Sequence, residues 1–228
     1  MTFISLQETN RITIPFCETL LQEVWKKSVY YYSIYGEEDY RYSFFATYSA
    51  TLLWALVQLE NFSNHNPDSI IKNRFDTLKK SSLAQLLLQY DTINRQSFVV
   101  VTMALVEDFI NSVCQEVFSK TYPNYSQNIK KLCDKIFPEN QYKFHVLYSL
   151  YLIRNSLHNN GYIKILNQGF DLQIGAKKYV FQKGQQITFS GWNNLLIITK
   201  ELLNIIIQII ENKDIKLIKK IEHTKIIC

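Results

Sequence analysis

Arg154 and His158 stand four residues apart in the stretch YLIRNSLHNNGYI, residues 151 to 163. On a helix, side chains at this spacing share one face, with Cβ atoms about 5 to 6 Å apart, so both can reach one small anion. Arginine offers permanently charged donors that match phosphate oxygens, and histidine exchanges a proton near neutral pH without a metal. With Asn155 beside them as an orienting amide, the pair suits phosphate binding and acid–base chemistry.

The same residues also fit an ordinary helix end. Cations in the last turn of a helix are stabilised by its dipole by roughly 0.3 to 1 kcal/mol each. The sequence Asn-Asn-Gly at residues 159 to 161 is a common helix exit. Spacing alone therefore leaves a capping role and a catalytic role open.

Apolar residues at helical spacing predict helices around the pair. The pair itself falls in a predicted helix over 140–161 with Gly161 as its C-terminal cap. Further helices are predicted at residues 39–62, from residue 67 with Asn66 as N-cap and Pro67 at the first position, between Pro123 and Pro138, and from about Trp192 to Asn212. Residues 81–120 exceed one ordinary helix, and YDTINRQ at 90–96 predicts a break or kink between two.

The period of the apolar residues changes to two in a glycine-rich window, which holds five of the six glycines. The alternating residues are Ile163 and Ile165, then Phe170, Leu172 and Ile174, then Tyr179 and Phe181, then Ile187 and Phe189. This pattern predicts a small antiparallel β insert near residues 161–190. The fold class is therefore mainly all-α: a helical bundle with this insert, in a single domain over 1–228, with residues 1–80 as an N-terminal helical elaboration of a core at 81–228.

The stretch LIRNSLHNNG resembles the signature of the HEPN superfamily, an Arg-Asn pair followed by a histidine near the end of a core helix. ALVEDFINSVCQEVF resembles the earlier HEPN helix, and GAKKYVFQKGQQITFSGW is similar to inserts of bacterial HEPN-like proteins. The likeness covers about residues 95 to 212 and does not extend to the first 80. The family pattern R-N-x-x-x-H is one residue longer than the spacing between Arg154 and His158.

The resemblance implies a HEPN-like bundle and, for active members, a metal-independent ribonuclease of a toxin or defence system. Such enzymes cut single-stranded RNA as homodimers, at a site where two motifs meet, and an antitoxin or regulatory protein is an expected partner. Arg154 would stabilise charge on the phosphorane-like transition state, His158 would transfer the proton, and Asn155 would position the phosphate or the histidine. Glu107 is a candidate orienting carboxylate, with a plain surface glutamate as the alternative. Other members are inactive dimerisation or binding modules. The shorter spacing between Arg154 and His158 leaves this alternative open for the present chain.

Composition and residue spacing narrow the classes of function that remain. The 228 residues are 47% hydrophobic and carry a net charge of +5, which permits a polyanion partner without requiring one. The four cysteines and the remaining histidines lack metal-ligand spacing, and no phosphate-binding loop occurs, so neither a metal nor a cofactor is expected. The apolar stretch at 195–210 is interrupted by polar residues, which predicts a buried helix, no membrane span and a cytoplasmic protein.

Two further groups of side chains suit RNA but have simpler explanations. Seven tyrosines lie between Tyr30 and Tyr48, where they can stack on bases or seal a helix interface. The insert has four lysines and one aspartate, and the segment 212–228 has five lysines and two acidic residues. These lysines can contact phosphates or form a solvated face.

Overall fold

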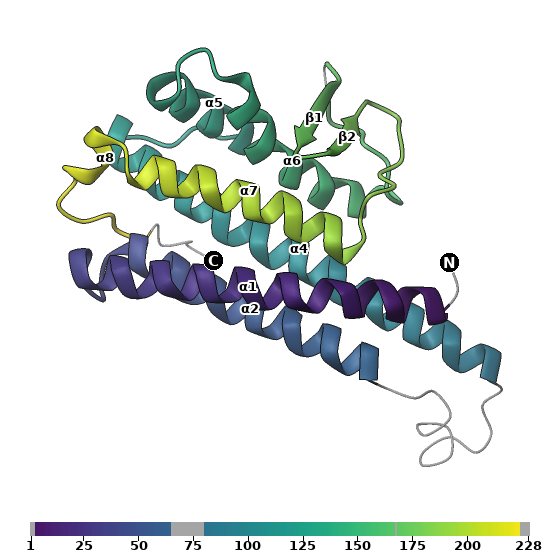
Figure 1. The fold of residues 1–228 in the computed structure, drawn as a ribbon. Helices are drawn as coiled ribbons and strands as arrows, with labels where there is room; N and C mark the ends of the chain where they lie inside the picture. Colours follow the sequence, from purple (N-terminus) through teal and green to yellow (C-terminus); the bar gives the residue numbers. More distant parts are fainter. Residues whose placement is uncertain (1–2, 65–79, 167, 224–228) are drawn as a thin grey trace.

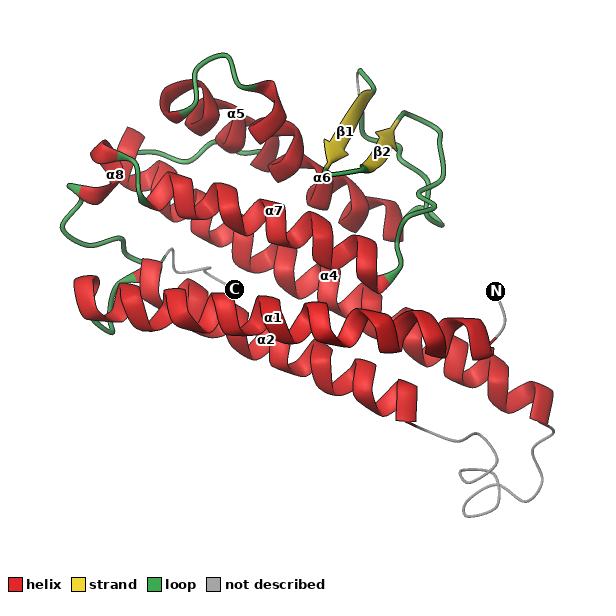
Figure 2. Ribbon diagram, in the orientation of Figure 1, coloured by secondary structure: helices red, strands yellow, loops and turns green. Residues whose placement is uncertain are grey.

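The computed structural model of the chain describes residues 3–64, 80–166 and 168–223. These residues are mostly helical (Figures 1 and 2), which confirms the predicted all-α class with a small antiparallel insert. The helices are α1 (Phe3–Tyr35), α2 (Tyr40–Asn64), α4 (Lys80–Phe118), α5 (Tyr125–Ile136), α6 (Gln141–Leu157), α7 (Trp192–Ile210) and α8 (Lys213–Lys216). The strands are β1 (Phe170–Ile174) and β2 (Lys177–Phe181). The helix predicted from residue 67, with Asn66 as its cap, lies outside the described residues.

The helices are arranged in tiers (Figure 1). The hairpin of α1 and α2 forms one side, α4 and α7 lie in the middle, and α5, α6 and the β-hairpin cover the other side. Buried apolar side chains from all tiers form one core, because each helix turns an apolar face inward. Tyr31, Tyr40 and Tyr48 are buried in it, so packing accounts for these members of the tyrosine group, whereas Tyr30 and Tyr32 are exposed.

The predicted break at residues 90–96 is wrong, because α4 runs unbroken through this stretch. The polar residues there have partners across the bundle. Asp91, which is 2% exposed, accepts hydrogen bonds from Arg95 Nε at 2.8 Å, Trp192 Nε1 at 2.9 Å and Asn10 Nδ2 at 3.2 Å. Side chains that are satisfied in this way can remain in a helix interior, since they do not compete for the helix backbone.

The end of α6 and the insert differ in detail from the prediction. The helix stops at Leu157 instead of continuing to Gly161, and the turn that follows contains Asn160 and Gly161, both with positive φ. Gly161 still helps to close the helix, because its N–H donates to the Ser156 carbonyl at 2.9 Å. Within the described insert, β1 and β2 pair antiparallel with Phe170 opposite Phe181. The expected flanking strands around Ile163 and Ile187 are reduced to a bridge between Tyr162 and Gln186.

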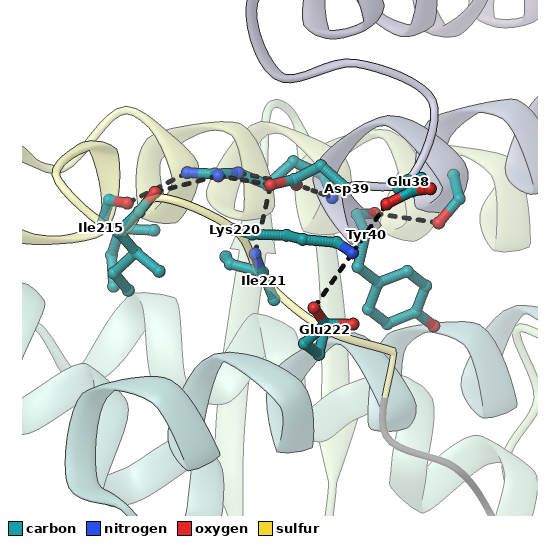
Figure 3. A network of polar contacts seen from close by, with 10 residues as sticks. Glu38, Asp39, Tyr40, Ile215, Lys220, Ile221 and Glu222 are labelled. Atoms are coloured by element: carbon teal, nitrogen blue, oxygen red, sulfur yellow. Dashed lines mark hydrogen bonds and ion pairs between the residues drawn. The ribbon is translucent and has the colours of Figure 1, made fainter.

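The segment that follows α8 is held against the α1–α2 turn by a buried ion pair. Arg41 is fully buried and donates to the Asp39 carboxylate through Nε and Nη2, and its guanidinium also donates to the carbonyls of Ile215 and Ile218. Figure 3 shows how Ile221 completes the network: its N–H donates to Asp39, and its carbonyl accepts from the N–H of Tyr40. The C-terminal part of the described chain is therefore an integral part of the bundle.

Within the described parts of the chain, two helices are long and apolar enough to cross a membrane by length and composition alone. They are residues 85–118 of α4 and all of α7, and 61% and 56% of their most apolar stretches are buried inside the bundle. The core helices of a globular protein meet the same criterion, because they too are apolar on most sides.

Candidate active site at the end of helix α6

The predicted site residues lie together at the end of α6. Arg154 is half-buried in the last turn, and its Nη1 donates to Asn155 Oδ1 at 3.2 Å. His158 is the exposed C-cap residue and keeps a helical backbone conformation, so its side chain follows Arg154 along the same face. Nδ2 of Asn155 is a buried donor without a hydrogen-bond partner. The arrangement thus places a guanidinium and an imidazole on one helix face, with the buried Asn155 amide beside the guanidinium.

The helix end does not use Arg154 or His158 as side-chain caps. The Ser156 carbonyl accepts from the N–H groups of Asn159 and Gly161, and the Asn155 carbonyl accepts from Asn159 Nδ2 at 2.9 Å. Among the hydrogen bonds of the described residues, none runs from the Arg154 guanidinium or the His158 imidazole to these carbonyls. The capping role is therefore taken by Asn159 and Gly161, which leaves the side chains of Arg154 and His158 available for another partner.

Glu107 is half-buried on α4, and no contact joins it to Arg154 or His158 among the described residues. Its charge acts instead on Tyr125 of α5. Burial is the main cause that raises the pKa of Tyr125, and the charge of Glu107 is the next largest. The Tyr125 hydroxyl donates to the Leu147 carbonyl of α6 at 3.2 Å. An orienting role for Glu107 towards the imidazole therefore gains no support from these contacts.

Several described lysines of the insert and the tail contact other side chains. Lys178 pairs with Asp171 at 2.7 Å, Lys177 donates to Asn194 Oδ1, and Lys220 bridges Glu38 and Glu222. These contacts are exposed and contribute little stability, so they do not prevent the lysines from meeting a phosphate.

The sequence interpretation missed a polar cluster that only the fold assembles. It found no companion carboxylate for His223, yet Asp108 of α4 lies 3.3 Å from His223 Nδ1. The Tyr40 hydroxyl donates to the same carboxylate at 2.5 Å, and burial and this hydrogen bond raise the pKa of Tyr40. The partners come from three distant segments, so no local spacing could have indicated the cluster.

An apolar surface on α4 was also missed. Five large apolar side chains on this helix are at least 40% exposed: Leu86, Tyr90, Ile93, Val100 and Val101. We call them the apolar α4 face. The side of α4 next to it approaches the end of α6, since Gln96 and Val99 line one small hollow with Ile153 and Leu157. Over residues 85–106 the charged residues of α4 are Asp91, which is buried, and Arg95, which is paired with it, so the face itself is uncharged.

The described residues contain no group of three or more His, Cys, Asp or Glu side chains placed to hold a metal ion. The thiols of Cys17, Cys114 and Cys133 are free, and burial raises the pKa of each to about 12. Comparisons with protein-family models, curated proteins and solved structures find no match to the chain.

Proposed function

We propose that the chain is a metal-independent endoribonuclease that cuts single-stranded RNA as a homodimer in the cytoplasm, in the manner of HEPN toxins and defence effectors. The observation that carries the proposal is the pairing of an arginine and a histidine side chain at the end of α6. His158 is exposed and Arg154 half-buried, and the helix end is capped without either side chain. A half-buried guanidinium that is hydrogen-bonded to Asn155 and an exposed imidazole on the adjacent turn can provide phosphate binding and proton transfer together.

The proposed reaction needs only these groups and the ribose 2′-hydroxyl. The 2′-oxygen attacks the adjacent phosphorus and loses its proton, the bond from phosphorus to the 5′-oxygen breaks, and the 5′-oxygen gains a proton. His158 transfers one of these protons, and a second copy of His158 across the dimer can transfer the other. Arg154 stabilises the charge that develops on the phosphate oxygens, and the Asn155 amide positions Arg154, to which it is hydrogen-bonded. The products are a 2′,3′-cyclic phosphate and a 5′-hydroxyl.

The test is incubation of the purified protein with single-stranded RNA in the presence of a chelator. Replacing His158 with alanine should slow cleavage by about 10²- to 10⁴-fold, the usual contribution of a general acid or base. Arg154→Ala should also slow it, while His223→Ala serves as a control at another exposed histidine. Equal cleavage by the wild type and the Arg154→Ala, His158→Ala double variant would exclude this site.

A second function is favoured by one observation, the three-residue gap between Arg154 and His158. It is shorter than the spacing in active members of the family that the motif resembles. This second function is that of a catalytically silent module that dimerises or binds nucleic acid or a protein. RNA binding or dimerisation without any cleavage would support this alternative over the nuclease.

A further inference from the structure

A hollow of about 620 Å³ lies between α5, α6 and β1. Its volume is within the range of small-molecule sites. Aromatic rings make up much of its wall, contributed by Phe137, Phe144, Tyr148 and Phe170, with His145 beside them. Its charged residues are Lys130, Asp134 and Glu139, so the charges nearly balance and the hollow does not attract a phosphate. It therefore suits a flat, uncharged ligand.

The rings on α6 form a row that leads from the hollow to the candidate active site. Phe144 and Tyr148 are stacked with centroids 5.4 Å apart, and Tyr148 and Tyr151 are stacked 5.5 Å apart. These residues follow the i, i+4, i+7 spacing of one helix face, which Asn155 and His158 continue. The rise from Phe144 to Asn155 is about 16 Å, a distance that a short stretch of single-stranded RNA can span. We call Phe144, Tyr148 and Tyr151 the α6 ring row.

Besides its three charged residues, the hollow has neutral donors and acceptors. Burial lowers the pKa of His145, so its imidazole is uncharged at neutral pH, and its ring stacks on Phe170 with centroids 4.1 Å apart and 10° between the planes. A neutral imidazole has one donor and one acceptor, and the nearby side-chain amides of Asn140 and Gln141 have both. Flat rings with such groups at their edges are what proteins use to bind unpaired bases.

We propose that the hollow and the α6 ring row bind unpaired nucleobases of an RNA strand whose backbone passes Arg154 and His158. Base binding extends the proposed function. It rests on the proposed nuclease only for the statement that the bound strand is RNA. The row selects RNA that is single-stranded at this place, because paired bases are stacked on each other and cannot reach the rings. Free nucleosides share the same chemistry, so the experiment must separate a base within a strand from a free base.

The experiment measures binding of a fluorescent, unstructured RNA oligonucleotide to the full chain carrying His158→Ala, which keeps the RNA intact. In that background Tyr148→Leu keeps an apolar side chain but removes the flat ring, and it should raise Kd about 5- to 100-fold. Tyr148→Phe keeps the ring and should restore binding. The matched control is Tyr142→Leu, since Tyr142 lies on the same helix, is 37% exposed and does not line the hollow.

The outcomes separate this proposal from the nuclease. A raised Kd for Tyr148→Leu supports the ring row even if the wild type cleaves no RNA, in which case only the nuclease fails. An unchanged Kd for Tyr148→Leu overturns the ring row, even if the wild type cleaves RNA through His158. Binding of adenosine or uridine alone, with an oligonucleotide Kd that does not respond to Tyr148→Leu, also overturns it and assigns the hollow to a free nucleoside.

Discussion

His145 is a histidine that the fold keeps uncharged. It lies half-buried against Phe170, and this burial lowers the pKa of its imidazole below the ordinary value of about 6.5. The unfolded chain then binds the proton more readily than the folded chain. The contribution of His145 to stability is therefore complete above the unfolded pKa and declines as pH falls through and below it.

We expect the melting temperature to fall between pH 7.5 and pH 5.5, and His145→Phe to reduce that fall. The phenyl ring preserves stacking on Phe170 but cannot take up a proton, so the difference between the two proteins isolates the imidazole. Thermal unfolding followed by circular dichroism at several pH values measures it. If the melting temperatures of the two proteins fell equally with pH, groups other than His145 would cause the whole pH dependence.

At the scale of elements, α4 depends on a carboxylate that the sequence suggested would interrupt it. Asp91 accepts from Arg95, Trp192 and Asn10 and thereby ties α4 to α7 and α1. Asp91→Ala should lower the free energy of unfolding by about 2 to 4 kcal/mol, because three buried or half-buried donors lose their acceptor at once. Urea unfolding measures this loss. Gln96→Ala, at an exposed position of the same helix, should change it by no more than about 0.5 kcal/mol.

The sequence predicted the helices and strands whose formation depends on residues close together in the chain. The helices α2, α5, α6 and α7 and the β-hairpin follow from apolar periodicity, prolines and glycines, and the structure has them. The unbroken α4 could not be predicted in the same way, because a polar run signals a turn unless its partners are known. The partners of Asp91 lie 101 residues away on α7 and 81 residues away on α1.

The candidate site was predictable for a related reason. Arg154, Asn155 and His158 are neighbours along one helix, so spacing places them together before any tertiary structure is known. The hollow needs α5 and β1 brought against α6, and the cluster at His223 needs Asp108 and Tyr40 from two other helices. Such sites depend on packing between distant segments, which periodicity does not encode.

At the scale of the whole molecule, the apolar α4 face bears on self-association. Its side chains are large and uncharged, and each is at least 40% exposed, so the face is a candidate interaction surface. A twofold interface brings a surface against its own copy, so a charge-free surface meets its copy without repulsion. The side of α4 next to this face approaches the end of α6, where Gln96 and Val99 line a hollow with Leu157, so a second copy seated on the face would lie near the helix that carries Arg154 and His158.

We therefore expect the chain to form a dimer, and Val100→Glu with Ile93→Glu to shift it to a monomer. Each copy would then place two carboxylates against the same two of its partner, and like charges facing each other at an interface cost several kcal/mol. Light scattering after size exclusion over a range of concentrations measures the shift, and exposed Gln22→Glu on α1 with exposed Gln127→Glu on α5 is the control for charge added away from the apolar α4 face. If the nuclease needs both copies, the monomeric variant should also lose RNA cleavage while its melting temperature at low concentration stays unchanged. A variant that remains dimeric would place the interface elsewhere, and a wild type that is monomeric at all concentrations would remove the second copy from the proposed site.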